Sequence, residues 1–385
     1  MPTKPRRLEQ IPGFNIDRVA AAAGDDPEVL RMENLDTDLE VPAGVKEATK
    51  AAVDRLDANS WLPFDGKPEM KEAVADFIER RSGMRYDPAS EVVITSGDGD
   101  AMLNALLVTT DPGDEVILTD PTYAGMANRV RLAGAVPRFA PLVAGPDGWR
   151  LDVDAFRGAA TERTRAVFVM SPSLPTGWVA SGDEWDAIAK VCRERDLWLI
   201  SWSMYEGVVF DGIPVISPAR LPDIRDRLVI VGGVSLEHRM IGWRVAWTIG
   251  PEALRSDLSK TQIYNGLVPS AILQAGAAVG LGEPPEDLAR IVEELQSRRD
   301  ETLRQLEGFP VVPSSGGWSL LMDTEALGID CAEASRRMLG QKVAATQMRG
   351  WGSDVADRYL RFVYSREPLE RLALLGERAR AALGS

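Results

Sequence analysis

Side chains that can accept or donate a proton near neutral pH are scarce in this sequence, and two of the best candidates are adjacent. The chain has one histidine, His238, directly after Glu237. Histidine is the most common general acid or base at this pH, and a neighbouring carboxylate can support it. With the hydroxyl of Tyr205 as a third group, His238, Glu237 and Tyr205 are the candidate catalytic residues. A structural or surface role for His238 is the alternative.

A short glycine turn suggests a second kind of chemistry, anion binding. Gly97, Asp98 and Gly99 follow an apolar run at Glu91–Thr95 and precede an amphipathic stretch at Ala101–Thr109. A turn from strand to helix directs backbone N–H groups and the positive end of a helix dipole at an anion. The alternative is a tight turn that only needs glycine conformations. Asp98 does not favour phosphate unless its carboxylate points away.

Several other site chemistries lack the residues they need. Cys192 and Cys331 are the only cysteines, so no disulfide framework is predicted, and one histidine cannot complete a zinc cluster. The turn at 97–99 has no third glycine of a dinucleotide-binding fingerprint. No G-x-S-x-G run supplies the serine of a hydrolase. The sequence therefore predicts no metal site.

Composition narrows the partners and the compartment. Among 385 residues, 58 are acidic and 44 are basic, which gives a net charge of −14. This acidic balance argues against nucleic acid and anionic membranes as partners. No run reaches the roughly 18–20 apolar residues of a membrane span, and the N-terminus lacks the apolar core of a secretory signal. We expect a cytoplasmic protein that acts on a small molecule.

The elements that position these residues follow an α/β pattern. Short β-branched runs alternate with helical stretches such as Glu184–Arg195, which is typical of a mostly parallel sheet covered on both faces. The expected strands of this sheet are Glu91–Thr95, Glu115–Thr119, Ala166–Met170, Leu197–Ser201 and Leu228–Val231. A long charged helix is expected at Pro284–Leu306, and further strands at Gly316–Asp323 and Tyr359–Val363.

These elements divide the chain into three segments. We expect an N-terminal arm over residues 1–50 that packs on a small domain. A large α/β domain would cover residues 51–280, and a small α+β domain residues 281–385.

Six segments along the chain form a pattern of motifs with a characteristic order and spacing. They are SWLPFDGKPEMKEAV (60–74), TSGDGDAM (95–102), DPGDEVILTDPTYAG (111–125), SPSLPTG (171–177), GGVSLEHRMIGWR (232–244) and YLRFVYS (359–365). In this order and spacing, the chain resembles the fold-type I aminotransferases of class I/II, which depend on pyridoxal phosphate (PLP). The resemblance runs from about Glu33 to the C-terminus. It implies a large domain with a mostly parallel, seven-stranded type of sheet sandwiched by helices, plus a smaller C-terminal α+β domain.

The resemblance also implies roles for residues at matching positions. The turn at Gly97–Gly99 and Arg244 would hold the cofactor phosphate, and Tyr123 would stack on the pyridine ring. Tyr205 would hydrogen-bond the phenolic oxygen of the cofactor. Arg361 would grip the substrate α-carboxylate through paired hydrogen bonds. For both arginines, a surface or packing role is the alternative.

Several positions depart from the family pattern, and they concern PLP contacts. The family forms a Schiff base through a lysine six residues before its Gly-x-Arg motif, and that position is Leu236. Trp202 stands where an acid pairs with the pyridine nitrogen, and Trp61 stands where a tyrosine reaches the neighbouring subunit. The remaining replacements are Leu174, Ser171 and Gly233.

From these departures the sequence predicts an enzyme without a cofactor, which performs a cyclisation, condensation, elimination or isomerisation in specialised metabolism. Arg361 would hold the carboxylate of a small, apolar or aromatic substrate. The expected pocket residues are Tyr123, Trp202, Trp61, Leu236 and Leu174. Trp351 is a further candidate for an aromatic pocket, whereas core packing is favoured for Trp243 and Trp318.

Two alternatives stay open at this point. One is a PLP-binding aminotransferase-like enzyme, with PLP held non-covalently. The other is a non-catalytic protein that binds a metabolite or a partner protein. As in the family, we expect a homodimer.

Overall fold

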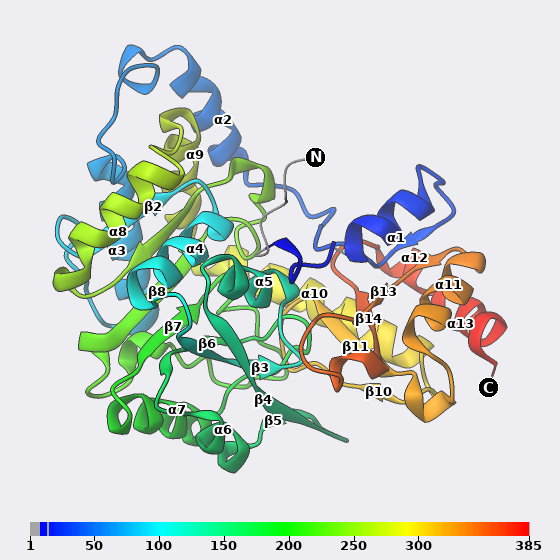
Figure 1. The fold of residues 1–385 in the computed structure, drawn as a ribbon. Helices are drawn as coiled ribbons and strands as arrows, with labels where there is room; N and C mark the ends of the chain where they lie inside the picture. Colours follow the sequence, from blue (N-terminus) through cyan, green and yellow to red (C-terminus); the bar gives the residue numbers. More distant parts are fainter. Residues whose placement is uncertain (1–7, 14, 385) are drawn as a thin grey trace, which may run out of the picture.

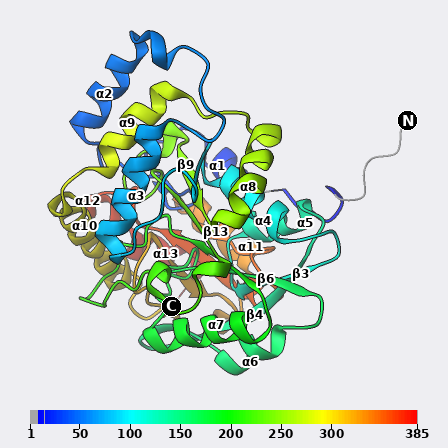
Figure 2. The same cartoon turned by 90° about the vertical axis from the view of Figure 1, so that its left-hand side faces the viewer.

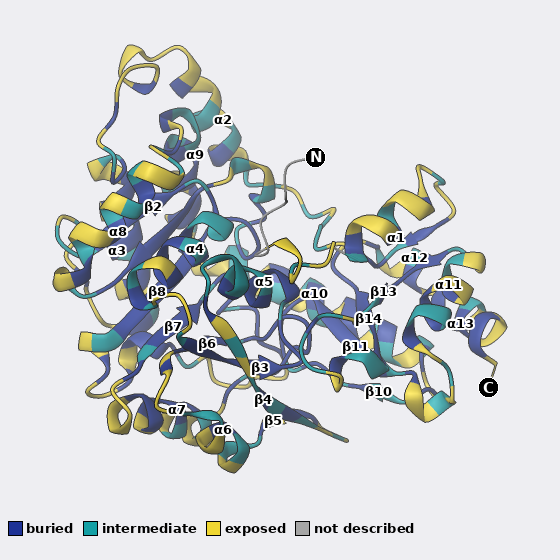
Figure 3. Ribbon diagram, viewed as in Figure 1, coloured by how far each residue is buried: buried dark blue, intermediate teal, exposed yellow. Residues whose placement is uncertain are grey.

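The structure is a computed structural model that describes residues 8–13 and 15–384. Figure 1 shows a larger and a smaller body side by side, with the chain ending in the smaller one. Figure 3 shows that the strands are largely buried, whereas the outward faces of the helices are exposed. No helix among the described residues is long and apolar enough to cross a lipid bilayer.

The larger body is built on a mostly parallel sheet. Its strands among the described residues, in spatial order, are β2 (Val92–Thr95), β9 (Ala246–Ile249), β8 (Leu228–Gly233), β7 (Trp198–Trp202), β6 (Thr164–Met170), β3 (Glu115–Asp120), β4 (Val136–Gly145) and β5 (Gly148–Leu151). The pairs of β9 with β2 and β8, and the β4–β5 pair, are antiparallel. The central strands are almost entirely buried, as expected for a sheet covered on both faces.

Helices cover both faces of this sheet. They are α2 (Ala43–Val53), α3 (Pro68–Ser82), α4 (Asp98–Thr109), α5 (Ala124–Leu132), α6 (Val153–Ala159), α7 (Gly182–Glu194), α8 (Glu252–Asn265) and α9 (Ala271–Leu281). Figures 1 and 2 place α6 and α7 on the opposite side of the sheet from α4 and α5. Helix α7 begins where it does because Ser181 and Glu184 form a reciprocal capping box.

The smaller body carries the strand on which the site depends. Its sheet is antiparallel, in the order β10 (Val311–Val312), β11 (Ser319–Asp323), β14 (Tyr359–Val363) and β13 (Thr346–Gln347). The helices beside it are α10 (Pro285–Gln305), α11 (Cys331–Gly340), α12 (Leu369–Leu372) and α13 (Leu375–Leu383). Because β14 has a neighbour on each side, Arg361 is held in register between Leu321 and Thr346.

The N-terminal part of the chain touches both bodies. Helix α1 (Asn15–Ala23) packs on the smaller one, where β1 (Leu30–Arg31) pairs in parallel with β12 (Val343–Ala344). The chain then crosses to the larger body, where α2 packs against α9 (Figure 1). Residues 1–7 and 14 of the expected arm lie outside the described residues, and the domain limits at residues 50 and 280 stay a prediction.

The predicted fold class is confirmed, and two features of the sheet were missed. The expected strands correspond to β2, β3, β6, β7, β8, β11 and β14. The β4–β5 hairpin escaped because β4 is largely half-exposed and contains Pro137 and Pro141. Strand β9 escaped because four residues, Ala246–Ile249, give too short an apolar run to separate from a loop.

Candidate active site

Arg361 is the strongest candidate for binding a charged ligand. It lies on β14, and its side chain is fully buried. Its Nη2 donates to the backbone carbonyl of Glu33, whereas Nε and Nη1 have no hydrogen-bond partner among the described residues. Burial lowers the pKa of Arg361 to about 10, so the group still carries its charge at neutral pH. The Glu33 carboxylate lies close enough to raise the pKa of Arg361, although less than burial lowers it, and no direct ion pair joins the two groups among the described residues. A buried cation with unpaired N–H groups favours an anion, which indicates an anion-binding site.

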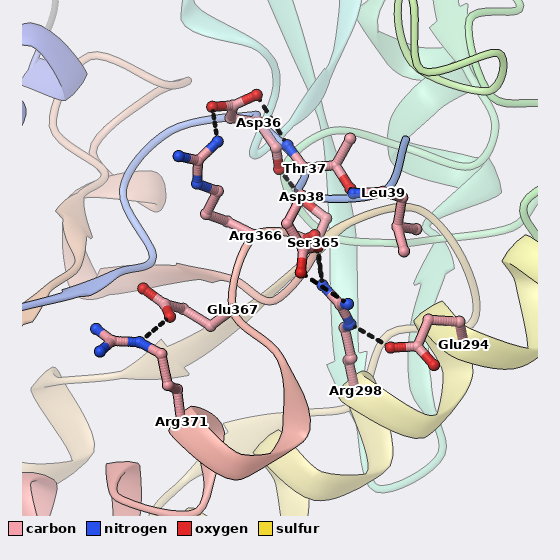
Figure 4. Close-up of polar contacts among 10 residues, drawn as sticks. All are labelled: Asp36, Thr37, Asp38, Leu39, Glu294, Arg298, Ser365, Arg366, Glu367 and Arg371. Atoms are coloured by element: carbon pink, nitrogen blue, oxygen red, sulfur yellow. Dashed lines mark hydrogen bonds and ion pairs between the residues drawn. The ribbon is translucent and has the colours of Figure 1, made fainter. Parts of the chain in front are cut away.

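The carbonyl of Glu33 belongs to a segment that is fixed on the smaller body. Figure 4 shows Arg298 of α10 reaching this segment, with Nη1 2.6 Å from Oδ1 of Asp38 and 2.9 Å from the carbonyl of Ser365. The Ser365 hydroxyl in turn donates to the carbonyl of Asp36 at 2.6 Å. The single acceptor that holds the guanidinium on β14 is therefore fixed in place.

Aromatic rings from both bodies surround this guanidinium. The guanidinium carbon of Arg361 lies 4.5 Å from the ring centroid of Trp351. Trp351 meets Tyr123 edge-on with centroids 5.9 Å apart, and Tyr123 packs on Trp202 at 5.2 Å. Tyr123 precedes α5 and Trp202 ends β7, so the larger body supplies these two rings. The candidate site thus lies where the two bodies meet.

Other buried groups near Arg361 are donors. Tyr205 lies close enough to raise the pKa of Arg361, although burial dominates, and its ring stacks on Trp318 with centroids 6.3 Å apart. The Tyr205 hydroxyl and the indole N–H groups of Trp202 and Trp318 have no hydrogen-bond partner among the described residues. Burial raises the pKa of Tyr205, so it keeps its proton at neutral pH. A ligand with several acceptor oxygens suits such a set of donors.

The glycine turn at the start of α4 is packed with arginine side chains. Gly97 has a φ of 104°, and a side chain there would clash with the guanidinium of Arg244. Nη2 of Arg244 lies 3.2 Å from Oδ1 of Asp98. At Gly99 a side chain would clash with Arg129, whose Nε donates to the Gly99 carbonyl at 3.0 Å. Asp98 therefore points to an arginine instead of away from the turn, and anion binding there stays a prediction.

Two predicted pocket residues, Leu236 and Leu174, are buried apolar side chains. Leu236 lies in the loop after β8, and Leu174 lies in the loop after β6. The backbone N–H of Leu174 donates to Sδ of Met170 at 3.4 Å. Neither side chain offers an amine, an acid or an amide, so both contribute packing only.

His238 and Glu237 line a cavity that lies apart from the cluster of rings around Arg361. This cavity of about 220 Å³ is lined by Phe77, Arg81 and the start of α10, and by none of the rings around the β14 arginine. Glu237 forms a two-pronged ion pair with Arg81, with Nη1 2.9 Å from Oε2. The His238 ring meets Phe77 edge-on at 5.3 Å, and burial lowers the pKa of His238 to about 4. The structure thus separates these side chains from the Arg361 cluster, and their catalytic role stays a prediction.

Trp61 also lies apart from the cluster. Its side chain is 72% exposed and meets Phe64 edge-on at 5.2 Å, in the segment before α3. This position gives it no place in the wall around the guanidinium. It fits the predicted contact with a second subunit better than it fits a pocket wall.

Comparisons with known proteins identify relatives of the chain. Residues 30–373 match the family model for aminotransferase class I and II. The aspartate/prephenate aminotransferase of Cereibacter sphaeroides is 35% identical over 76% of this chain and 72% of its own length. The arginine–pyruvate transaminase of Pseudomonas aeruginosa is 31% identical over 91% and 90%. The solved N-succinyldiaminopimelate aminotransferase from Mycobacterium tuberculosis matches with a TM-score of 0.90, at 29% identity, over 98% of this chain and 99% of its own.

These relatives correct two predictions. The prediction of an enzyme that works without PLP is wrong, because relatives that match most of this chain are aminotransferases. The prediction of no cofactor is wrong for the same reason, since aminotransferases of this class use PLP. Both errors came from weighing a few replaced positions above the whole-chain pattern. The findings favour the alternative, a PLP-binding aminotransferase-like enzyme.

The residues of the site do not fit PLP in the attachment that the family uses. Leu236 provides no amine for a Schiff base. The indole of Trp202 packs on Tyr123, the ring that would otherwise stack on the pyridine. The donors expected for the rest of the cofactor are present: Tyr205, whose hydroxyl has no partner among the described residues, and the turn at Gly97 with Arg244, which contacts Asp98. A covalent link at position 236 is therefore excluded by the side chain itself.

Some residues of the site were missed by the sequence reasoning. The carbonyl of Glu33 gave no signal, because any residue has one. Arg129 carries no motif of its own, and only its approach to Gly99 shows its place. Asp120 and Ser353, described below, lie in or near motif segments, but their contact joins residues 233 positions apart.

Proposed function

Because the chain belongs to the class I and II aminotransferase family, we propose that it is an aminotransferase-like enzyme that acts on a small amino or keto acid. The buried guanidinium of Arg361, with two nitrogens that lack a partner among the described residues, is the observation that carries this proposal. An α-carboxylate would supply the missing anion through charge-assisted hydrogen bonds. The relatives named for amino acid and pyruvate substrates support the same chemical class.

The residues around the arginine would orient the rest of the substrate. Trp351 lies against one face of the guanidinium and excludes water from it, which strengthens the interaction with a carboxylate. The hydroxyl of Tyr205 stays protonated and can donate a hydrogen bond to an oxygen of the substrate. Tyr123 and Trp202 offer flat apolar surfaces to the side chain of the substrate.

The relatives favour PLP as the cofactor, and Leu236 means that it would be held without a bond to that position. When bound, PLP supplies an electron sink next to the α-carbon of an amino acid. Gly97 and Arg244 are the residues of this chain that would hold the phosphate. The Trp202 ring packs on Tyr123, the residue that would stack on the pyridine ring in such a complex.

Two titrations test the proposal. Isothermal calorimetry with L-aspartate, L-arginine and pyruvate, each with and without PLP, should show binding that Arg361→Ala abolishes. Absorbance between 330 and 430 nm, recorded during the PLP titration, reports whether PLP binds. Binding of none of these acids, or equal binding by Arg361→Ala, would contradict the proposed function. Binding with no conversion of any amino donor would favour the non-catalytic alternative.

We also infer a homodimer, which the surface supports. Leu56, Trp61 and Tyr264 expose 85%, 72% and 90% of their side chains. A contact with a second copy of the chain would cover these exposed apolar side chains. Sedimentation at micromolar concentration should give twice the 42.0 kDa mass of one chain, and a monomer mass would contradict the inference.

A further inference from the structure

A loop of the smaller body is fastened to the larger body directly beside the candidate site. This loop, residues 348–357, connects β13 to β14 and contains Trp351. Ser353 donates to Asp120 twice, from its backbone N to Oδ1 at 3.2 Å and from its hydroxyl to Oδ2 at 2.5 Å. The backbone N–H of Thr122 donates to the carbonyl of Trp351 at 2.7 Å.

The geometry of this loop is built around the carboxylate of Asp120. Asp120 is only 3% exposed, at the end of β3. A side chain at Gly352 would clash with that carboxylate, so a glycine is needed for the close approach. A buried carboxylate that receives two hydrogen bonds from one residue holds that residue in a single place.

The loop positions Trp351, whose ring lies next to a residue of each body. Its centroid lies 4.5 Å from the guanidinium carbon of Arg361, which belongs to the smaller body. It lies 5.9 Å from the centroid of Tyr123, which belongs to the larger body and follows Asp120 by three positions. One short stretch of the larger body, Asp120–Tyr123, therefore supplies one wall of the site and fixes another.

We propose that Asp120 is a positioning residue, which acts through Ser353 and Trp351 to set the carboxylate subsite at Arg361. The proposal rests on the proposed function, because it assumes that Arg361 takes the carboxylate of an amino or keto acid. Asp120 itself does not contact the ligand. Its loss leaves the arginine in place but removes the ring that shields the guanidinium from water.

The test compares Asp120→Asn with Asp354→Asn, a matched control on the same loop. Asp354 is exposed, and its charge contributes to the raised pKa of Asp120, although less than burial does, so this variant controls for the loss of one negative charge on the loop. Calorimetry with L-aspartate and pyruvate should show about tenfold weaker binding for Asp120→Asn and an unchanged affinity for Asp354→Asn. Ser353→Ala removes the hydroxyl hydrogen bond and keeps the backbone one, so it should weaken binding in the same direction as Asp120→Asn but by less. It also serves if Asp120→Asn does not fold.

A double-mutant cycle separates positioning from a merely structural effect. In a Trp351→Ala background, Asp120→Asn should weaken binding no further, because the ring through which it acts is gone. Additive losses, or wild-type affinity in both Asp120→Asn and Ser353→Ala, would overturn the proposal.

Hydrogen exchange of the loop tests the role of Asp120 in holding the loop separately from the proposed function. Amides of residues 348–357 should exchange faster in Asp120→Asn than in the wild-type protein, and at the wild-type rate in Asp354→Asn. If the wild-type protein binds neither acid, the proposed function fails, and the exchange arm still decides whether Asp120 holds the loop. Unchanged exchange in Asp120→Asn would overturn the positioning role.

Discussion

Two arginines of this chain, the largely buried Arg81 and the fully buried Arg361, both lie over aromatic rings but have different partners. Each guanidinium lies over an aromatic ring, Arg81 at 4.6 Å from the centroid of Phe77 and Arg361 at 4.5 Å from that of Trp351. Burial opposes the charge of Arg81, but the complete ion pair with Glu237 outweighs it and raises the pKa of Arg81. Arg361 has one backbone carbonyl, and burial lowers its pKa.

This difference indicates that Arg81 serves the structure and that Arg361 serves binding. A buried ion pair that already holds both charges has no free donor to offer a ligand. A buried cation with free N–H groups retains the capacity to bind an anion, at a cost in the stability of the ligand-free protein. The cavity beside His238 is lined by the completed pair, Arg81 and Glu237. The aromatic cluster surrounds the incomplete site, the guanidinium of Arg361 on β14.

The largest expected effect is on folding, at the completed pair. Glu237→Ala leaves Arg81 buried without its carboxylate, so the free energy of unfolding should fall by about 3–5 kcal/mol. Urea denaturation measures this loss. The control is Glu72→Ala, which breaks an exposed contact with Arg85 and should cost less than about 1 kcal/mol. Equal losses at the two sites would remove the distinction between a buried and an exposed pair.

The next effect concerns binding at the incomplete site. Arg361→Ala should weaken the binding of a carboxylate ligand by about 2–5 kcal/mol, which is roughly 30-fold or more. Calorimetry with the acid that the wild-type protein binds gives this number. Arg85→Ala, on the surface, is the matched control and should leave the affinity unchanged. A small effect at Arg361 would mean that the anion binds elsewhere.

A smaller effect tests the cost of the unpaired charge directly. Arg361→Met keeps much of the side-chain volume and removes the buried cation, so the ligand-free protein should be as stable as before or more stable, within about 1 kcal/mol. Arg81→Met should instead destabilise the protein, because it leaves Glu237 buried alone. Thermal unfolding of the two variants side by side decides the matter. Loss of stability in Arg361→Met would show that the contacts of the guanidinium with the Glu33 carbonyl and Trp351 contribute more to the fold than the burial of its charge costs.

A pH dependence tests the same region of the completed pair in a different way. His238 has a pKa of about 4 in the folded chain, against an unfolded value of about 6.5. Between these values the unfolded state binds more protons, so this group destabilises the fold as the pH falls from about 6.5 to 4. Because His238 is the only histidine in the sequence, proton NMR gives one imidazole titration without an assignment step. A titration near 6.5 would place the ring in water.

The sequence predicted the scaffold well, because strand and helix patterns extend over many residues. The buried strands Thr164–Met170 and Leu228–Gly233 could be recognised from their apolar runs alone. The site was harder. Arg361 was recognised from its motif. That two of its nitrogens lack hydrogen-bond partners among the described residues depends on which distant groups pack around it in the fold. His238 and Glu237 looked catalytic by type, and only the fold shows that Glu237 is occupied by Arg81.

The cofactor was the part that local reasoning predicted wrongly. The sequence predicted Leu236 and Trp202 as departures from the family pattern, and the structure shows both buried. A side chain at one position excludes a bond at that position, as Leu236 does for a Schiff base. It does not exclude non-covalent binding, because phosphate donors such as Arg244 lie elsewhere in the fold.

The most direct test of the account is a crystal structure of the protein with pyruvate or L-aspartate bound. We predict that the carboxylate lies within hydrogen-bond distance of the Arg361 guanidinium and that Trp351 covers it. The contrary result would be a bound acid elsewhere, with the free N–H groups of Arg361 paired to the carboxylate of Glu33. That arrangement would make Arg361 a completed pair like Arg81.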